Sequence, residues 1–198
     1  MKKLAMLPLF VFLFNSVQSI AQTSIPAADI QVKMAILSCP DEKRANATVM
    51  GYTPEGKLTV LRKGTNEMIC LADDPKQKGF SVSCYHKDLD PFMQRGRELK
   101  AAGKTQEEVI KIRDEEAKAG KIKLVKSPST LYVYGAKEED CDLVAGTVKN
   151  GYMRYVVYIP YATPESTGLP LKQDLPGMPW IMDPGTPRAH IMITPAKQ

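Results

Sequence analysis

The chain has few of the residues that usually carry chemistry. Its 198 residues include two histidines, one tryptophan and four cysteines, and aromatic residues make up only 7%. No G-x-S-x-G, H-E-x-x-H, C-x-x-C, EF-hand or Gly-rich phosphate-binding motif occurs. These absences leave no motif-based evidence for a hydrolase, a zinc protease or a nucleotide-binding protein. No motif calls for a cofactor or a metal ion, so we expect neither.

Long hydrophobic runs are also absent. The apolar run Leu4–Phe14 is shorter than the roughly 20 residues that a membrane-spanning helix needs. Lys2 and Lys3 precede it, and Ser19-Ile20-Ala21 places small residues where a signal peptidase cuts. We therefore predict a secretory signal peptide at residues 1–21, the alternative being an uncleaved anchor. Residues 22–198 would form one exported globular domain with no stable membrane insertion.

Charge of a single sign is lacking as well. Removing residues 1–21 takes away two lysines and no acid, so the net charge falls from +5 to +3. Basic and acidic residues alternate along 107–118, which is typical of a solvated helix face. A nucleic-acid surface would carry a one-signed basic patch. We therefore expect no nucleic-acid partner. The expected partner is an unidentified small molecule or an envelope protein.

The four cysteines form an even set, which favours disulfides in an oxidising compartment. Residues 67–72 and 80–85 have strand composition, and the turn-forming segment 73–79 predicts a hairpin that pairs Cys70 with Cys84. Cys39–Cys141 then follows by elimination. The functional alternative is a thiol nucleophile at Cys84, activated by His86 two residues later.

Hydropathy and turn signals predict an α+β fold. We expect a helix near 29–37, where a strand was the alternative, and an antiparallel meander over 48–85. Two helices within 88–120 should form a hairpin, with a capping box at Thr105 and Glu108. The Asn150-Gly151 turn predicts that 143–148 pairs with 152–158. Eight prolines from Pro160 onward predict an extended C-terminal wrap that ends in a strand at 189–193. An antiparallel sheet would thus pack against a helical hairpin.

The residues that carry chemistry gather in two places. His86 and His190 are the only histidines, and with Asp183 or Asp88 they would form an acid–base or metal site if they converged. The segment 179–190 also holds Trp180 and Arg188, which makes Trp180, Arg188 and His190 the candidate binding residues. The structural alternative is two separate histidines and a tryptophan that fills a packing gap.

Four stretches resemble a group of small exported bacterial proteins to which no activity is assigned. They are 61–66, 70–75, 84–99 and 179–192, so the resemblance spans most of the mature chain. It implies export, a periplasmic location and a single domain, and adds no catalytic residue. The leading hypothesis is a binding or accessory module of the bacterial envelope. The alternative is a small envelope hydrolase or metal-binding protein that uses His86 and His190.

Overall fold

The computed structural model describes residues 25–196. The predicted signal peptide at 1–21 lies outside the described residues. Over 25–196, no helix combines the length and the hydrophobicity needed to cross a membrane.

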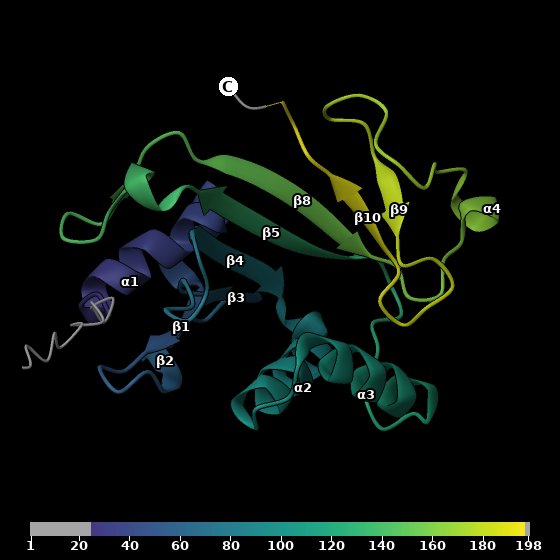
Figure 1. The fold of residues 1–198 in the computed structure, drawn as a ribbon, viewed down its shortest axis with the longest axis horizontal. Coiled ribbons are helices and arrows are strands. Elements are labelled where there is room, and N and C mark those ends of the chain that lie inside the picture. Colours follow the sequence, from purple (N-terminus) through teal and green to yellow (C-terminus); the bar gives the residue numbers. More distant parts are fainter. Residues whose placement is uncertain (1–24, 197–198) are drawn as a thin grey trace, which may run out of the picture.

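The described chain folds as an α+β protein built on one large sheet (Figure 1). The α-helices are α1 (Ala28–Ala35), α2 (Asp90–Ala101), α3 (Gln106–Lys118) and α4 (Pro164–Thr167). Short 3-10 helices occupy η1 (Ile36–Ser38), η2 (Asp41–Asn46), η3 (Lys87–Leu89) and η4 (Glu138–Asp140). The strands are β1 (Thr48–Tyr52), β2 (Leu58–Arg62), β3 (Met68–Leu71), β4 (Phe80–His86), β5 (Ser129–Ala136), β6 (Cys141–Asp142), β7 (Thr147–Val148), β8 (Tyr152–Tyr158), β9 (Trp180–Met182) and β10 (His190–Ile193).

Eight strands form the large sheet in the order β2-β1-β3-β4-β5-β8-β10-β9, and β6 pairs with β7 separately. The predicted antiparallel meander over 48–85 is wrong, because β3 lies beside β1 and runs parallel to it. The link between β2 and β3 crosses the start of β1, where the amides of Thr65 and Asn66 donate to Asn46 O at 2.9 and 3.1 Å. Only a glycine fits in this crossing: a Cβ on Gly64 would lie 2.3 Å from the backbone of residues 46–48.

The Asn150-Gly151 turn does not join the strands that we expected. Asn150 adopts the left-handed conformation that the dipeptide favours, with φ 49°. However, β7 pairs back with β6, and β8 leaves the turn to lie between β5 and β10. The predicted pairing of 143–148 with 152–158 is therefore wrong.

Side chains on the two faces of the sheet pack against different helices. One face, which we call the α1 face, includes Val82 and Cys84 and packs against Met34 and Ala35 of α1. The opposite α2 face includes Tyr85, whose hydroxyl lies 2.7 Å from Asp90 Oδ1 at the start of α2. The predicted helix near 29–37 and the predicted strand at 189–193 are present as α1 and β10. The capping box at Thr105 and Glu108 is formed at the start of α3.

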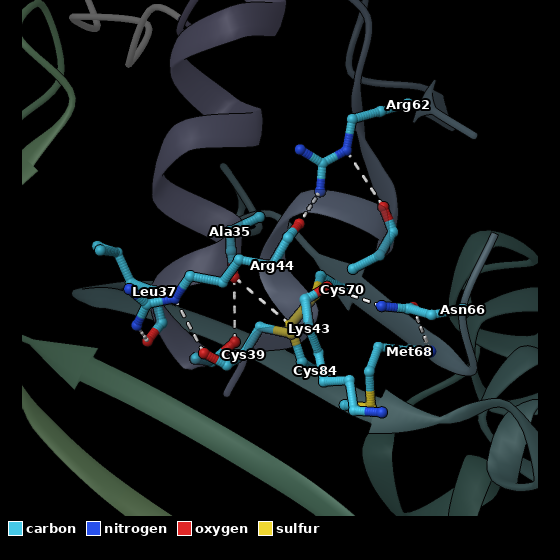
Figure 2. The surroundings of a disulfide bond; sticks show 12 residues. Ala35, Leu37, Cys39, Lys43, Arg44, Arg62, Asn66, Met68, Cys70 and Cys84 are labelled. Carbon is cyan, nitrogen blue, oxygen red and sulfur yellow. Dashed lines mark hydrogen bonds between the residues drawn. A yellow bond between two sulfur atoms is a disulfide. The ribbon is translucent and has the colours of Figure 1, made fainter. Parts of the chain in front are cut away.

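Cys70 and Cys84 lie directly opposite each other on β3 and β4 and form the predicted disulfide (Figure 2). The second predicted bridge is absent: Cys39 and Cys141 are free thiols. Cys39 packs with Cys70 and Cys84 after η1, whereas Cys141 packs beside Phe80 at the start of β6. The two free cysteines thus belong to separate apolar clusters, which elimination from sequence could not reveal.

Candidate functional site

The structure does not bring the two histidines together. His190 is opposite Tyr158, and Tyr158 is opposite Ser129, so all three share the α2 face. His86 alternates with Tyr85 along β4 and therefore lies on the α1 face. The two histidines lie three strands apart in the sheet order, about 14 Å at the usual strand spacing. This placement excludes a shared mononuclear metal site, whose metal–nitrogen bonds are about 2 Å.

His190 is held by packing and by its own backbone. Its ring stacks on Tyr158, with the centroids 5.2 Å apart, and Nδ1 lies 2.7 Å from Arg188 O. His190 is buried. The hollow that borders Tyr158 and Pro187 has a volume of only about 10 Å³. His190 therefore has a packed environment.

Asp183 and Arg188 form an ion-pair network with helix α3. Arg188 Nη1 donates to Asp183 Oδ2 at 2.5 Å, and Nε donates to Asp114 Oδ1 at 3.1 Å. Asp183 has φ 51°, so the loop after β9 turns sharply to present its carboxylate. Trp180 lies at the edge of the α2 face, and its indole nitrogen is buried without a hydrogen-bond partner. The network joins the last two strands to α3 and already neutralises Arg188.

His86 has a local role at the end of β4. Its Nδ1 accepts a hydrogen bond from Asp88 N at 3.2 Å and so caps η3. The Asp88 carboxylate lies 3.5 Å from the same nitrogen. Cys84, the predicted partner of His86 in nucleophilic catalysis, is disulfide-bonded and buried. A thiol nucleophile at Cys84 is therefore absent from this oxidised structure.

A larger cleft lies where the sequence predicted only a turn. It has a volume of about 470 Å³, within the usual range for small-molecule sites. One wall is the loop between β3 and β4, and the other is the segment that follows β5. Phe80 pairs with Ala136, so the two segments leave the β4–β5 pair at the same end. The cleft is lined by Asp73, Pro75, Lys76, Gln77, Lys78, Gly79, Phe80, Glu138, Cys141 and Leu143.

The sequence of the first wall fixes the position of Asp73. Asp74 Oδ1 accepts from Lys76 N at 3.0 Å, and Gly79 adopts φ 77°, which together close the loop. Asp73 Oδ1 accepts from Ser81 N at 2.8 Å, which ties the carboxylate to the start of strand β4. The Asp73 side chain therefore stands at a defined place at the base of the loop.

The second wall is anchored to helix α1. Asp142 Oδ1 accepts from the backbone amides of Val144 and Ala145 at 2.9 and 2.8 Å. Lys33 Nζ of α1 donates to Ala145 O at 2.7 Å. Figure 1 shows the segment around η4, in green, beside α1 at the same end of the sheet. These bonds hold Cys141 and Leu143 opposite Asp73.

Acidic groups lie close to Asp73 in the cleft. Burial raises the pKa of the Asp73 carboxyl from 3.8 to about 6, and the nearby Asp74 and Glu138 carboxylates act in the same direction. Burial also raises the pKa of the Cys141 thiol to about 11, with further contributions from Asp73, Asp140 and Glu138. Lys76 and Lys78 are exposed at the rim. Near neutral pH the cleft therefore presents a carboxylate and a protonated thiol.

An apolar hollow adjoins the cleft. It shares Asp73, Pro75, Phe80 and Leu143 with the cleft and adds Met34 and Ala72 from the core. Its own volume is about 50 Å³, enough for a few methylene groups. A bound molecule with a polar end at Asp73 would find an apolar surface beside it.

Within residues 25–196, the only group of three closely spaced potential metal ligands is Cys39, Cys70 and Cys84, and two of these are consumed by the disulfide. No protein-family model, curated protein or solved structure matches this chain. The candidate site consequently rests on the geometry and charge of the Asp73 cleft.

Proposed function

We propose that this protein is an exported binding module of the bacterial envelope, and that the Asp73 cleft binds a small organic cation. The observation that carries the proposal is a half-buried carboxyl at the base of a cleft of about 470 Å³. A half-buried carboxylate without a basic partner favours a ligand that brings the positive charge. No ion pair to Asp73 occurs among the residues that the structure describes.

The charges around Asp73 favour a cation over an anion. The charged groups that shift the pKa of Asp73 are Asp74 and Glu138, and both raise it. A bound ammonium group would offset this repulsion between carboxylates and stabilise the ionised form of Asp73. An anion would meet the same repulsion, and the exposed Lys76 and Lys78 at the rim would be screened by solvent salt.

The adjoining hollow favours a ligand with a short apolar chain. Phe80 and Leu143 line both spaces, so a chain that leaves an ammonium group at Asp73 would contact both. Burial of each methylene group contributes about 0.8 kcal/mol. The proposed ligand class is therefore a small primary or quaternary amine with an alkyl or aryl substituent.

A titration followed by NMR tests this proposal. n-Butylammonium is added to the 15N-labelled protein at pH 7.5, and butyrate of the same chain length is added to a second sample. We expect butylammonium to shift the amide signals of Gly79 and Ser81 in a saturable way, because Ser81 N donates to Asp73. Butyrate should leave these signals in place.

Two variants make the titration specific. Asp73→Asn removes the charge but keeps an oxygen that can accept from Ser81 N, and we expect at least a tenfold loss of affinity. Asp174→Asn is the matched control, because Asp174 is exposed in the distant 168–179 segment. Equal responses to butylammonium and butyrate, or unchanged affinity in Asp73→Asn, would show that the cleft does not select cations.

Export and a periplasmic location remain part of this proposal. A disulfide between Cys70 and Cys84 is compatible with an oxidising compartment, since cytosolic proteins rarely keep one. The resemblance to exported bacterial proteins points to the same compartment. The mature N-terminus, measured by intact mass after expression with the leader, would test cleavage after Ala21.

The finer architecture is also proposed. The four-residue link 102–105 between α2 and α3, together with the Arg95–Glu116 ion pair at 2.7 Å, supports a helical hairpin. An extended C-terminal wrap is supported by bonds from Ile181 N to Pro170 O at 3.0 Å and from Gly177 N to Thr194 O at 2.8 Å. These contacts hold the proline-rich segment along the edge of β9 and β10.

The hydrolase alternative has less support. It needs His86 and His190 in one site, and the sheet register places them on opposite faces. Trp180, Arg188 and His190 remain predicted binding residues with a packed environment, and no observation favours them over the Asp73 cleft.

A further inference from the structure

Three cysteine sulfur atoms lie together beneath helix α1. The Sγ atoms of Cys39, Cys70 and Cys84 are all within 4.8 Å of one another. Figure 2 shows Cys39 beside the Cys70–Cys84 disulfide, with Ala35 above the sulfur atoms. Cys84 Sγ lies 3.7 Å from Ala35 O, which places this strand cysteine against the end of α1. A free thiol is thus in reach of a disulfide inside the core.

We propose that these three cysteines form one internal thiol–disulfide exchange site, in which Cys39 displaces Cys70 or Cys84. The Cys39 thiolate attacks Sγ of one strand cysteine, and a new S–S bond forms while the Cys70–Cys84 bond breaks. The electron pair of the broken bond stays on the displaced sulfur, which takes up the proton that Cys39 lost. The exchange consumes neither an oxidant nor a reductant.

Burial makes the exchange internal to the molecule. Cys39 is 2% exposed, and Cys70 and Cys84 are fully buried. Small thiols and other proteins therefore lack access to these sulfur atoms in the folded state, whereas Cys39 is already in place. Cys141, the other free thiol, lies in a different apolar cluster.

The exchange would change how α1 is attached. Cys39 directly follows η1, and η1 continues from α1. The Cys70–Cys84 bridge joins two neighbouring strands that hydrogen bonds already pair. A bridge from Cys39 to either strand would instead link the α1–η1 segment covalently to the sheet. The chain would therefore exist as two disulfide isomers that differ in the tethering of α1.

The charged groups near Cys39 come from η2, β2 and the start of β3. Arg44 and Arg62 lower the pKa of the Cys39 thiol, and Glu42 and Glu67 raise it. Arg44 Nε also donates to Cys39 O at 3.0 Å, and Lys43 pairs with Glu67 at 2.8 Å. Burial outweighs the cations and brings the pKa of Cys39 to about 11. The thiolate fraction, and with it the exchange rate, should rise tenfold per pH unit between pH 7 and 9.

Alkylation after incubation at different pH values tests this inference. The folded, oxidised protein is held at pH 7, 8 or 9, quenched in acid, denatured and labelled with N-ethylmaleimide. Trypsin separates the three cysteines, because lysines or arginines lie between them. We expect label on Cys39 and Cys141 at once, and label on Cys70 or Cys84 that grows with time and about tenfold faster per pH unit.

Two single variants define the controls. Cys39→Ser keeps the disulfide and should show no label on Cys70 or Cys84 at any pH. Cys141→Ser removes the distant thiol and should exchange like the parent protein. Equal labelling of Cys70 or Cys84 in Cys39→Ser and the parent protein would overturn the inference, as would loss of labelling in Cys141→Ser.

A second measurement covers the case in which the Cys70–Cys84 isomer is so strongly favoured that no label on Cys70 or Cys84 is detected. Cys70→Ser and Cys84→Ser each leave two cysteines of the cluster. Each variant is refolded from the reduced, denatured state in a buffer of oxidised and reduced glutathione, and we expect Cys39 to form a bridge with the remaining strand cysteine in at least one of them. If neither bridge forms and the parent protein shows label only on Cys39 and Cys141, the inference is wrong.

Discussion

At the scale of single residues, Asp73 distinguishes the cleft from the rest of the surface. Several other acids have pKa values lowered by an ion pair or a cap, such as Glu116 beside Arg95 and Glu108 in the capping box. Burial acts on Asp73 in the opposite direction. A carboxyl placed this way costs stability when it ionises, and such a cost is common at ligand sites.

Because ionising Asp73 costs stability, the parent protein and Asp73→Asn should differ in stability by an amount that depends on pH. Its pKa is about 6 in the folded protein, above the value of 3.8 expected in the unfolded chain. Ionisation therefore favours unfolding: the penalty is absent below pH 3.8, grows between pH 4 and 6, and is complete above that range. We expect Asp73→Asn to be about 1–2 kcal/mol more stable than the parent protein at pH 7.5.

Urea denaturation at pH 4 and pH 7.5 provides the measurement. At pH 4 the parent carboxyl is protonated in the folded protein and nearly isosteric with asparagine, so the difference in the free energy of unfolding between the two proteins should be much smaller than at pH 7.5. A stability gain that is the same at both pH values would contradict a raised pKa at Asp73.

At the scale of elements, the least predictable feature is the order of the first four strands. The residue composition of 48–52, 57–62, 67–72 and 80–85, with turn-forming residues between them, was sufficient to predict four strands. Their order depends on the link at 63–67, which passes across the start of β1 instead of folding back as a hairpin. Gly64 is the sequence signal for this close approach, but it is equally typical of an ordinary turn.

Replacement of Gly64 tests the crossing. A Cβ there would lie 2.3 Å from Asn46 O, Ala47 C and Thr48 N, which are backbone atoms that cannot rotate away. We expect Gly64→Ala to lower the free energy of unfolding by at least about 2 kcal/mol. Gly135→Ala is the matched control, because a Cβ at Gly135 has its nearest contacts at 3.5 Å. It should change stability by less than about 1 kcal/mol.

Thermal or chemical denaturation of both variants gives the comparison. If Gly64→Ala is as stable as Gly135→Ala, the link does not cross β1 at the distance described, and the parallel β1–β3 pairing would need revision.

Helices were easier to predict than strand order because their signals are local. The capping box at Thr105 and Glu108 lies within four residues and is present as predicted. Asn150-Gly151 forms a turn as expected, but a dipeptide carries no information on which strands it joins. The cleft wall at 138–143 follows from the pairing of Phe80 with Ala136, a register between segments more than fifty residues apart.

At the scale of the whole molecule, the residues that the sequence singled out and the Asp73 cleft lie in different parts of the sheet. The scarce residues His86, His190 and Trp180 attracted attention because they are chemically versatile. In the folded chain they are separated, stacked or packed, whereas Asp73 acquires its unusual environment only through burial. The Asp73-Asp74-Pro75 stretch and the acidic run 138–140 were both visible in the sequence. Their convergence depends on the β4–β5 register.

The molecule also contains two independent chemical centres at the α1 end of the sheet. The Asp73 cleft opens beside η4, and the three-cysteine cluster lies in the core beneath the end of α1. The cleft proposal concerns charge and does not require cysteine chemistry. The exchange proposal concerns buried sulfur and does not require a ligand, so each can fail without the other.

The most direct test of the central claim is the pKa of Asp73 itself, measured by the 13C shift of its carboxyl carbon with and without n-butylammonium. The free protein should titrate near pH 6, because burial and neighbouring acids disfavour the carboxylate. Saturating butylammonium should lower the pKa of Asp73 by one unit or more, since a bound cation stabilises the charged form. A pKa that butylammonium leaves unchanged would contradict the account of this cleft as a cation-binding site.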